Sequence, residues 1–131
     1  MIVIKQSIVD QMKNHASNEV PIEACGYLAG IDNEITTIYP MTNMDHCAKH
    51  FSLDPQEQLK VMKDARTHGL KLLAVYHSHP VTPARMSTED KKLAFDPDIV
   101  YIIYSLCDEE IRGFRMVENN EFEEVDLEVG S

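Results

Sequence analysis

Cysteine is scarce in this sequence of 131 residues, and no two cysteines form a C-x-x-C pair. The three that occur, Cys25, Cys47 and Cys107, are odd in number and widely spaced. This spacing argues against a disulfide framework and against a zinc site built from thiolates alone. We therefore expect a reducing compartment. We also expect Cys25 to pack inside the protein and Cys47 to lie in an exposed loop.

Basic residues are few, because 12 lysines and arginines stand against 22 acidic residues and give a formal net charge of −10. Such a surface repels phosphate backbones and anionic lipid headgroups, which disfavours binding to nucleic acid. Residues 108–131 hold nine acids and only Arg112 and Arg115, a balance of −7. We interpret this stretch as a solvated surface. The alternative is that it steers a basic partner.

Long apolar runs are absent, and nowhere does the sequence reach the roughly 18 consecutive apolar residues that predict a membrane-spanning helix. The apolar run at residues 1–4 is too short for a signal peptide. We therefore expect a cytoplasmic protein without membrane contact. At 44% hydrophobic and 26% charged, and without repeats or long linkers, the chain is expected to form one domain over residues 1–131.

The spacing of apolar residues predicts strands at residues 1–4, 25–31, 34–39, 70–76, 99–104, 111–117 and 122–129. It predicts helices at residues 5–17, at about 54–69, and, more briefly, from residue 87. Leu59 and Met62 should lie on the buried stripe of the second helix. Two turns are expected, one at residues 32–33 and one near Asn119-Asn120. These elements indicate a single-domain α/β fold, with a mixed β-sheet flanked by helices.

Two histidines, His77 and His79, leave the end of a predicted buried strand. Side chains two residues apart on a strand point the same way, so the two imidazoles converge. A lone pair of this kind is more often structural than metal-binding. Asp90 likewise has a simple explanation as the acid of a capping box that Ser87 begins. Together, however, two imidazoles and a carboxylate are the three protein ligands of an open zinc site, although iron, manganese or copper would also accept them.

Glu23 lies among small and apolar residues just before a predicted strand. Exclusion of water there would raise its pKa toward the range that suits a general base. Hydrolysis by a metal-activated water molecule needs such a base. A simple cap or turn carboxylate is the alternative, because no spacing rule brings residue 23 next to residue 77.

In combination, these residues resemble the JAMM, or MPN-plus, zinc metallopeptidases. One anchor of the resemblance is Glu23 within the pattern P-x-E-x-C-G-x-L-x-G. The other is His77-x-His79-P, followed by Ser87 and Asp90, with His79 and Asp90 separated by 90 minus 79, or eleven, positions. Alone, His-x-His is a weak motif, but the five residues in this order are specific.

The resemblance spans nearly the whole chain, because Asn43 and residues 51–55 look like the family's loop into its long helix. It implies the JAMM/MPN fold, a three-layer arrangement similar to that of cytidine deaminases. It also implies that His77, His79 and Asp90 bind one zinc ion per chain.

The same resemblance implies roles for the remaining residues. Glu23 would be the general acid/base that acts on the metal-activated water, and Ser87 would help to hold the tetrahedral oxyanion. The family closes the loop at residues 81–86 over its substrate, which makes Pro83 and Arg85 candidate substrate contacts. A plain surface loop is the alternative for these two residues.

The implied activity is hydrolysis of a peptide or isopeptide bond at the C-terminal tail of a ubiquitin-like protein. The short chain is similar to the bacterial and archaeal members that act on sulfur-carrier proteins with a Gly-Gly tail. Two other functions stay open. One is a non-catalytic, metal-bound module that binds a ubiquitin-like protein, and the other is a zinc amidohydrolase of a small molecule.

Overall fold

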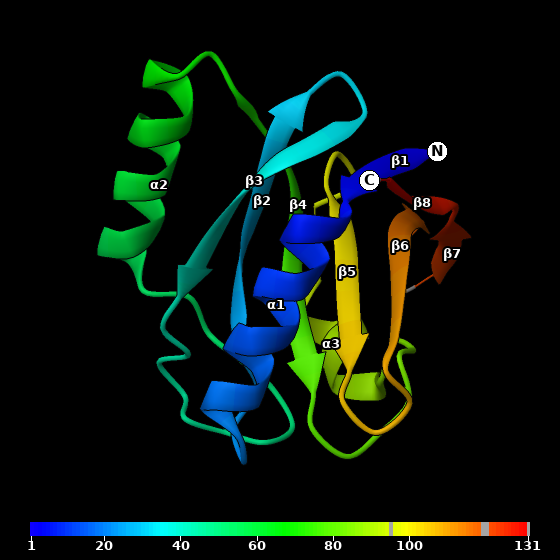
Figure 1. Ribbon diagram of the computed structural model, residues 1–131. Coiled ribbons are helices and arrows are strands. Elements are labelled where there is room, and N and C mark those ends of the chain that lie inside the picture. Colours follow the sequence, from blue (N-terminus) through cyan, green and yellow to red (C-terminus); the bar gives the residue numbers. More distant parts are fainter. Residues whose placement is uncertain (95, 119–120, 131) are drawn as a thin grey trace.

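The computed structural model describes residues 1–94, 96–118 and 121–130. Through them runs an eight-stranded mixed sheet in the order β7-β6-β5-β4-β2-β3-β1-β8 (Figure 1). The strands are β1 (Ile2–Lys5), β2 (Cys25–Ile31), β3 (Glu34–Met41), β4 (Lys71–His79), β5 (Val100–Ser105), β6 (Glu110–Glu118), β7 (Glu121–Val125) and β8 (Leu127–Gly130). The helices are α1 (Gln6–Glu19), α2 (Pro55–Thr67) and α3 (Thr88–Leu93). The predicted α/β fold, a mixed sheet flanked by helices, is confirmed.

Helices lie on both faces of the sheet, with α1 in front of it and α3 behind it in Figure 1. On the first face, α1 buries Ile8, Met12 and Ala16, which recur every four residues as the predicted apolar stripe requires. These side chains join the larger of two apolar clusters. A smaller cluster around Val75 and Tyr101 fills the opposite face. The sheet therefore separates two cores, and the candidate site belongs to the face of the smaller one.

Helix α2 departs from the expected packing. Leu59 is 54% exposed and Met62 is 46% exposed, and Ala65 is the helix residue that is buried. The prediction of a buried stripe through Leu59 and Met62 was therefore wrong. Polar contacts attach the helix to the sheet instead, from Gln58 to the Tyr27 hydroxyl (3.1 Å) and from the Tyr39 hydroxyl to Asp64 (2.5 Å). Tyr27 and Tyr39, which are paired across β2 and β3, thus hold α2 through their hydroxyl groups.

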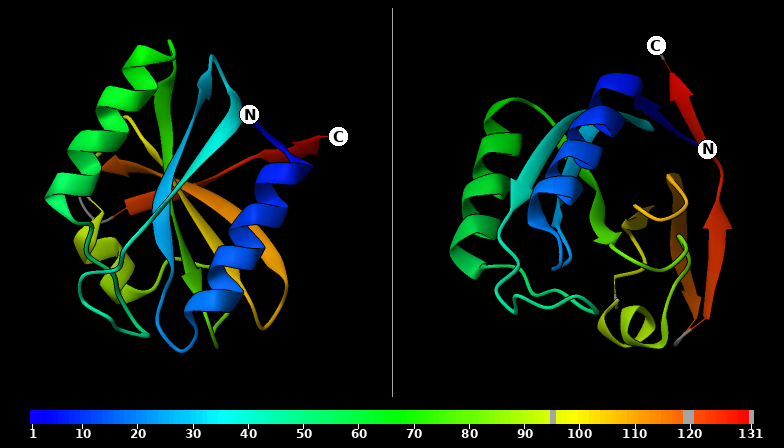
Figure 2. Two further views of the ribbon diagram at one scale, coloured as in Figure 1. Left: turned by 60° about the vertical axis from the view of Figure 1, so that its left-hand side comes forward. Right: turned by 60° about the horizontal axis from the view of Figure 1, so that its bottom comes forward.

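The predicted strand at residues 122–129 is two strands, separated at Asp126. β7 pairs antiparallel with β6, whereas β8 pairs parallel with β1 at the other end of the sheet. The carbonyl of Asp126 accepts a hydrogen bond from the Ile2 amide (2.9 Å) at this transition. β7 and β8, the two ends of the strand order, are separated in the chain by Asp126 alone. The sheet therefore curls, as the two views of Figure 2 show. The turn expected near Asn119-Asn120 lies outside the described residues.

The acidic stretch near the C-terminus is exposed to solvent. Each of its nine acids is exposed, and Arg112 lies 3.4 Å from Glu110 and 3.7 Å from Glu124. The stretch is therefore exposed, as expected of a solvated surface. No helix among the described residues has the length and apolarity needed to cross a membrane.

Glycine in the C-G-x-L-x-G pattern allows close packing around the central strands. A Cβ atom at Gly26 would clash with the carbonyl oxygen of Tyr39 and lie 2.8 Å from the hydroxyl of Tyr76. That hydroxyl lies 2.7 Å from Nδ1 of His15 on α1. Glycine at position 26 therefore leaves room for a partly buried hydrogen bond that ties α1 to β4, the strand that carries the two histidines.

Candidate metal centre

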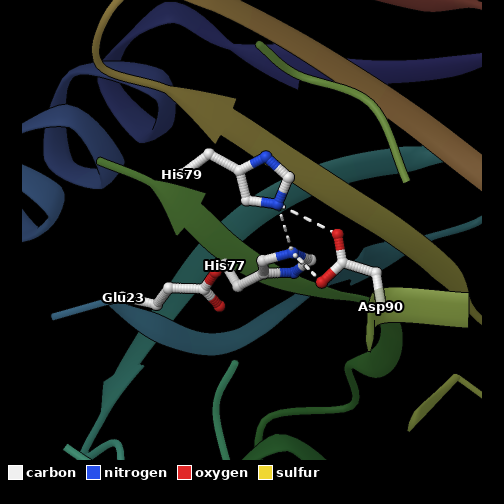
Figure 3. Close-up of side chains that lie close together, drawn as sticks. All are labelled: Glu23, His77, His79 and Asp90. Atoms are coloured by element: carbon white, nitrogen blue, oxygen red, sulfur yellow. Dashed lines mark hydrogen bonds and ion pairs between the residues drawn. The ribbon is translucent and has the colours of Figure 1, made fainter. Parts of the chain in front are cut away.

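The register of two antiparallel strands brings Glu23 to the histidines. Cys25 on β2 lies opposite His77 on β4. Two residues further along, Glu23 precedes the start of β2 and His79 ends β4, so both side chains lie on the face of the sheet that His77 occupies. Asp90 reaches the same point from the first turn of α3 (Figure 3). The structure therefore brings together four of the five residues that the sequence singled out, and the fifth, Ser87, caps the helix that carries Asp90.

The four side chains form a tight and buried cluster. Nε2 of His77 lies 3.2 Å from Nε2 of His79 and 3.1 Å from Oδ1 of Asp90, and Nε2 of His79 lies 2.9 Å from Oδ2 of Asp90. With Glu23 included, one potential ligand atom from each residue lies within 4.8 Å of the others. None of the four residues is more than 4% exposed.

These distances fit a divalent cation. Tetrahedral zinc, with bonds of about 2.0 to 2.1 Å to nitrogen and oxygen, separates its ligand atoms by about 3.3 Å. Two imidazole nitrogens and a carboxylate oxygen already stand close to that separation. Among the atoms of the described residues, Oε1 of Glu23, Nδ1 of His77 and Oδ1 of Asp90 are buried without a hydrogen-bond partner. Unpaired buried oxygens that face two ring nitrogens are what a cation would satisfy.

Neighbouring groups fix the orientation of both rings. Nδ1 of His79 lies 2.8 Å from the carbonyl oxygen of Pro83. Because a carbonyl only accepts, this nitrogen donates the proton, and Nε2 of the neutral ring keeps its lone pair for the cluster. The ring of His77 stacks on Phe51, with 4.9 Å between centroids and 27° between planes. Each histidine thus has a contact that holds its Nε2 toward the cluster.

Ser87 and Asp90 form the capping box that the spacing predicted. The Asp90 amide donates to Oγ of Ser87, and the Ser87 amide donates to Oδ2 of Asp90, both at 3.0 Å. Asp90 is nevertheless a member of the cluster as well. The carboxylate of Asp90 therefore serves both as part of the helix cap and as a candidate ligand, because the first turn of α3 directs it toward the histidines of β4.

A cleft of about 360 Å³ opens beside the cluster. Glu23, His79 and Ser87 line it together with residues 48–49, 81–82 and 88–89. A second hollow of about 320 Å³ shares His79 and Ser87 and adds Pro83 and Arg85, the two candidate substrate contacts. Two members of the buried cluster, Glu23 and His79, therefore border the same hollows as the candidate substrate contacts.

Two positioning contacts were not predicted from the sequence. The Ala24 amide donates to Oγ of Ser78 (2.8 Å), and the Ser78 amide donates to the Ala24 carbonyl (2.9 Å). Ser78, between the two histidines, thus fixes the residue next to Glu23. Residues 44–46 and 48–49 are exposed, as expected of the loop around Cys47. Cys47 itself is half-buried, and its carbonyl accepts a hydrogen bond from the Glu23 amide (2.8 Å), so the loop also contacts the site. Cys25 is fully buried, as predicted, and burial raises the pKa of its thiol to about 12.

Burial and charge shift the acid–base properties of the cluster. Burial, followed by the nearby charge of Asp90, raises the pKa of Glu23 to about 9. For Asp90, burial favours the neutral acid, but the close contacts with the imidazoles of His77 and His79, together with the Ser87 amide, outweigh it and hold the pKa well below its usual range. Burial lowers the pKa of His79, yet the contacts to Asp90 and to the Pro83 carbonyl raise it above its usual value overall. An acid with a raised pKa beside an ionised one is a common arrangement in hydrolytic sites.

We expect the free energy of unfolding of the metal-free protein to fall as the pH rises from about 5 to 9. The pKa of Glu23 rises from 4.5 to about 9 on folding, so its contribution to stability is complete below pH 4.5 and is lost as the pH approaches 9. One retained proton gives a slope of up to about 1.4 kcal/mol per pH unit. His79, whose pKa is also raised, acts in the same direction above its ordinary value of 6.5.

Urea denaturation of chelator-treated protein at several pH values measures this slope. The Glu23→Gln variant cannot ionise at position 23, so it should show a flatter dependence. Asp90 does not affect this comparison, because its lowered pKa changes the free energy of unfolding only below about pH 3.8. Equal slopes for the variant and the unsubstituted protein would show that burial does not raise the pKa of Glu23.

Comparisons with known proteins agree with the geometry. Residues 5–117 match the family described as prokaryotic homologs of the JAB domain. The CysO-cysteine peptidase of Mycobacterium tuberculosis is 36% identical over 129 residues, which cover 95% of this chain and 88% of that protein. The desampylase of Haloferax volcanii is 30% identical over 104 residues, 77% of this chain and 75% of that protein. A solution structure from Desulfitobacterium hafniense superposes with a TM-score of 0.90 at 39% identity, covering 99% of this chain and 93% of that one. The chain therefore belongs to the family of prokaryotic JAB-domain proteins.

Proposed function

We propose that this protein is a zinc metallopeptidase that hydrolyses a peptide or isopeptide bond at the C-terminal tail of a ubiquitin-like or sulfur-carrier protein. The observation that carries the proposal is the buried convergence of Glu23, His77, His79 and Asp90 beside an open cleft. The relatives named CysO-cysteine peptidase and desampylase support the substrate class. We place the reaction in the cytoplasm, as the sequence predicts.

His77 and His79, through Nε2, and Asp90, through its carboxylate, would hold one zinc ion per chain. When bound, the ion supplies positive charge that acidifies a water molecule, polarises the scissile carbonyl and lowers the pKa of Glu23 from its metal-free value. The stack of Phe51 on His77 and the bond from His79 to Pro83 keep the two rings from turning away. These contacts prepare the ligand set before any substrate arrives.

Glu23 moves the proton. Its carboxylate accepts a proton from the attacking water and returns it to the amine that leaves. Because the side chain is 2% exposed, bulk water does not compete for that proton. The hydrogen bonds from the Glu23 amide to Cys47 and from the Ala24 amide to Ser78 fix the backbone here and so limit the movement of the carboxylate.

The cleft positions the substrate. Ser87 lines it, and its hydroxyl can donate to the oxyanion while its oxygen keeps accepting the Asp90 amide. Pro83 and Arg85, on the exposed loop beyond His79, would contact the carrier tail. A Gly-Gly tail has no side chains, so it suits a cleft that brings the backbone close to Glu23 and His79.

A direct test uses a small ubiquitin-like carrier protein whose Gly-Gly tail is extended by one C-terminal cysteine or by a short peptide. We expect the protein to release the extension after the second glycine, as followed by mass spectrometry. Treatment with a zinc chelator should remove at least about 90% of the activity, because a metal-activated water provides most of the rate enhancement. Added zinc should restore it.

A carrier with Ala-Ala in place of Gly-Gly is the matched control, and it should be cleaved at least about tenfold more slowly, because methyl groups crowd the cleft. Tight binding of the carrier without cleavage would point to a non-catalytic binding module. Hydrolysis of small amides but not of the carrier would point to a small-molecule amidohydrolase. Either result would overturn the proposed substrate.

A further inference from the structure

We propose that Asn43 is a positioning residue for the reaction, because its one side-chain amide fixes the loop of residues 43–53 that holds both the backbone of Glu23 and the ring of His77. The inference rests on the proposed function and deepens it. Asn43 contacts neither the cleft nor a candidate ligand side chain, so we place it behind the site and not in it.

The amide of Asn43 is buried and its hydrogen-bonding capacity is fully used. Asn43 is 2% exposed. Its Nδ2 donates to the carbonyls of Glu23 (3.1 Å) and His50 (3.1 Å), with a longer contact to that of Cys47 (3.4 Å). Its Oδ1 accepts from the amides of Asp45 (3.0 Å) and Ser52 (3.2 Å). One side chain thus replaces the secondary structure that this loop lacks.

The first route leads to Glu23. The carbonyl of Glu23 accepts from Asn43, and the amide of Glu23 donates to the Cys47 carbonyl (2.8 Å), which is also within reach of Asn43. Both backbone polar groups of the proposed general base are therefore held by this loop. Without them, the Ala24–Ser78 pair and the bond from the Ile22 amide to the Glu19 carbonyl (2.9 Å) would still hold the segment before β2, but neither involves the backbone of Glu23.

The second route leads to His77. Phe51 stacks on its ring, and the residues on either side of Phe51 are the two whose backbone groups bind Asn43, at the His50 carbonyl and the Ser52 amide. Asn43 therefore clamps the backbone of Phe51 from both sides. A further bridge pairs Asn43 with Leu53. One buried amide thus sets the position of both a base and a ligand ring in the cluster.

The chemistry of this position requires an amide. Aspartate has almost the same size, but it would turn an oxygen toward three carbonyl oxygens that need a donor. Asn43→Asp therefore tests the donor without creating a cavity. Asp45→Asn is the matched control, because it makes a carboxylate–amide exchange in the same loop. The Asp45 side chain is exposed, and its Oδ2 lies 3.0 Å from Nδ1 of His50.

Hydrogen exchange followed by NMR gives a measurement that does not depend on activity. In Asn43→Asp we expect the Glu23 amide, which is bonded to the loop, to exchange at least about tenfold faster. The Ala24 amide, which is bonded to Ser78, should change less than about twofold, as should both amides in Asp45→Asn. Equal acceleration at residues 23 and 24, or none at either, would overturn the inference. This result stands whether or not the protein cleaves a carrier tail.

Kinetics on the zinc-loaded protein give the second measurement. We expect Asn43→Asp to lower kcat by about 10- to 100-fold, the cost of displacing a reacting group by about an ångström, with KM within about threefold and zinc still bound. In a Glu23→Gln background the same change should lower the residual kcat by less than it lowers the kcat of the otherwise unsubstituted protein, because the base is already gone and only the route through Phe51 to His77 remains. A full additional loss in that background, or an unchanged kcat in the single variant, would contradict the role. Failure of the unsubstituted protein to cleave any carrier would instead refute the proposed function.

Discussion

Replacement of Glu23 by glutamine is expected to lower kcat for carrier-tail hydrolysis by about 1,000-fold or more while zinc stays bound. Glutamine fills almost the same volume in a site that is 2% exposed, but it cannot accept a proton from water and return it to the leaving amine. General acid–base catalysis typically contributes about 10²- to 10⁴-fold, and here one group would serve both halves of the transfer. The three proposed ligands are untouched.

Steady-state kinetics with elemental analysis of the same samples separate the possible roles of Glu23. Glu128→Gln, an exposed substitution on β8, provides the control and should retain full activity. Unchanged hydrolysis by Glu23→Gln would show that the base lies elsewhere. Loss of zinc together with activity would make Glu23 a ligand instead, a role that its distance from the other three residues also permits.

Replacement of His79 by alanine is expected to remove both metal and activity. Nε2 of His79 lies within 3.2 Å of both other proposed ligands, so its loss leaves only two ligands for the ion. Loss of even an outer contact to a metal ligand typically costs about 10- to 100-fold in affinity, and loss of the ligand itself should cost more. We expect zinc content to fall from about one to below about 0.1 per chain after dialysis.

His50→Ala is the matched control for this experiment. His50 lies in the neighbouring loop, pairs with Asp45 at 3.0 Å, and belongs to no described cluster of three or more potential ligands. Its replacement should leave zinc content at about one per chain. Full zinc occupancy in His79→Ala would refute the assignment of His79 as a required ligand of the centre.

Much of the site could be predicted because its spacing follows from regular geometry. His77 and His79 share a strand face, and Ser87 and Asp90 occupy fixed positions of a helix cap, so both pairs are local and periodic. The placement of Glu23 depends on how β2 pairs with β4. That register is a property of the sheet, which explains why position 23 could be linked to position 77 only by resemblance to a known family.

Other features could not be predicted because tertiary contacts override local pattern. The apolar residues of α2 have helical spacing, yet tyrosines from the sheet hold the polar side of the helix and leave Leu59 and Met62 exposed. Val125 and Leu127 alternate as one strand would, but their two strands pair at opposite ends of the sheet. Asn43 has no periodic context at all, because its partners are backbone groups of an irregular loop.

The parallel pairing of β1 with β8 has a consequence for how the chain reaches this structure. Ile2 lies opposite Leu127, a separation of 127 minus 2, or 125 positions. Contacts this distant in sequence require closure of a long loop and form late during folding. Until then β1 has only β3 beside it, and its other edge presents free amides and carbonyls next to the apolar side chains of Ile2 and Ile4. Chains caught at this stage are therefore open to strand pairing with one another, and completion of the final strand removes that route to aggregation.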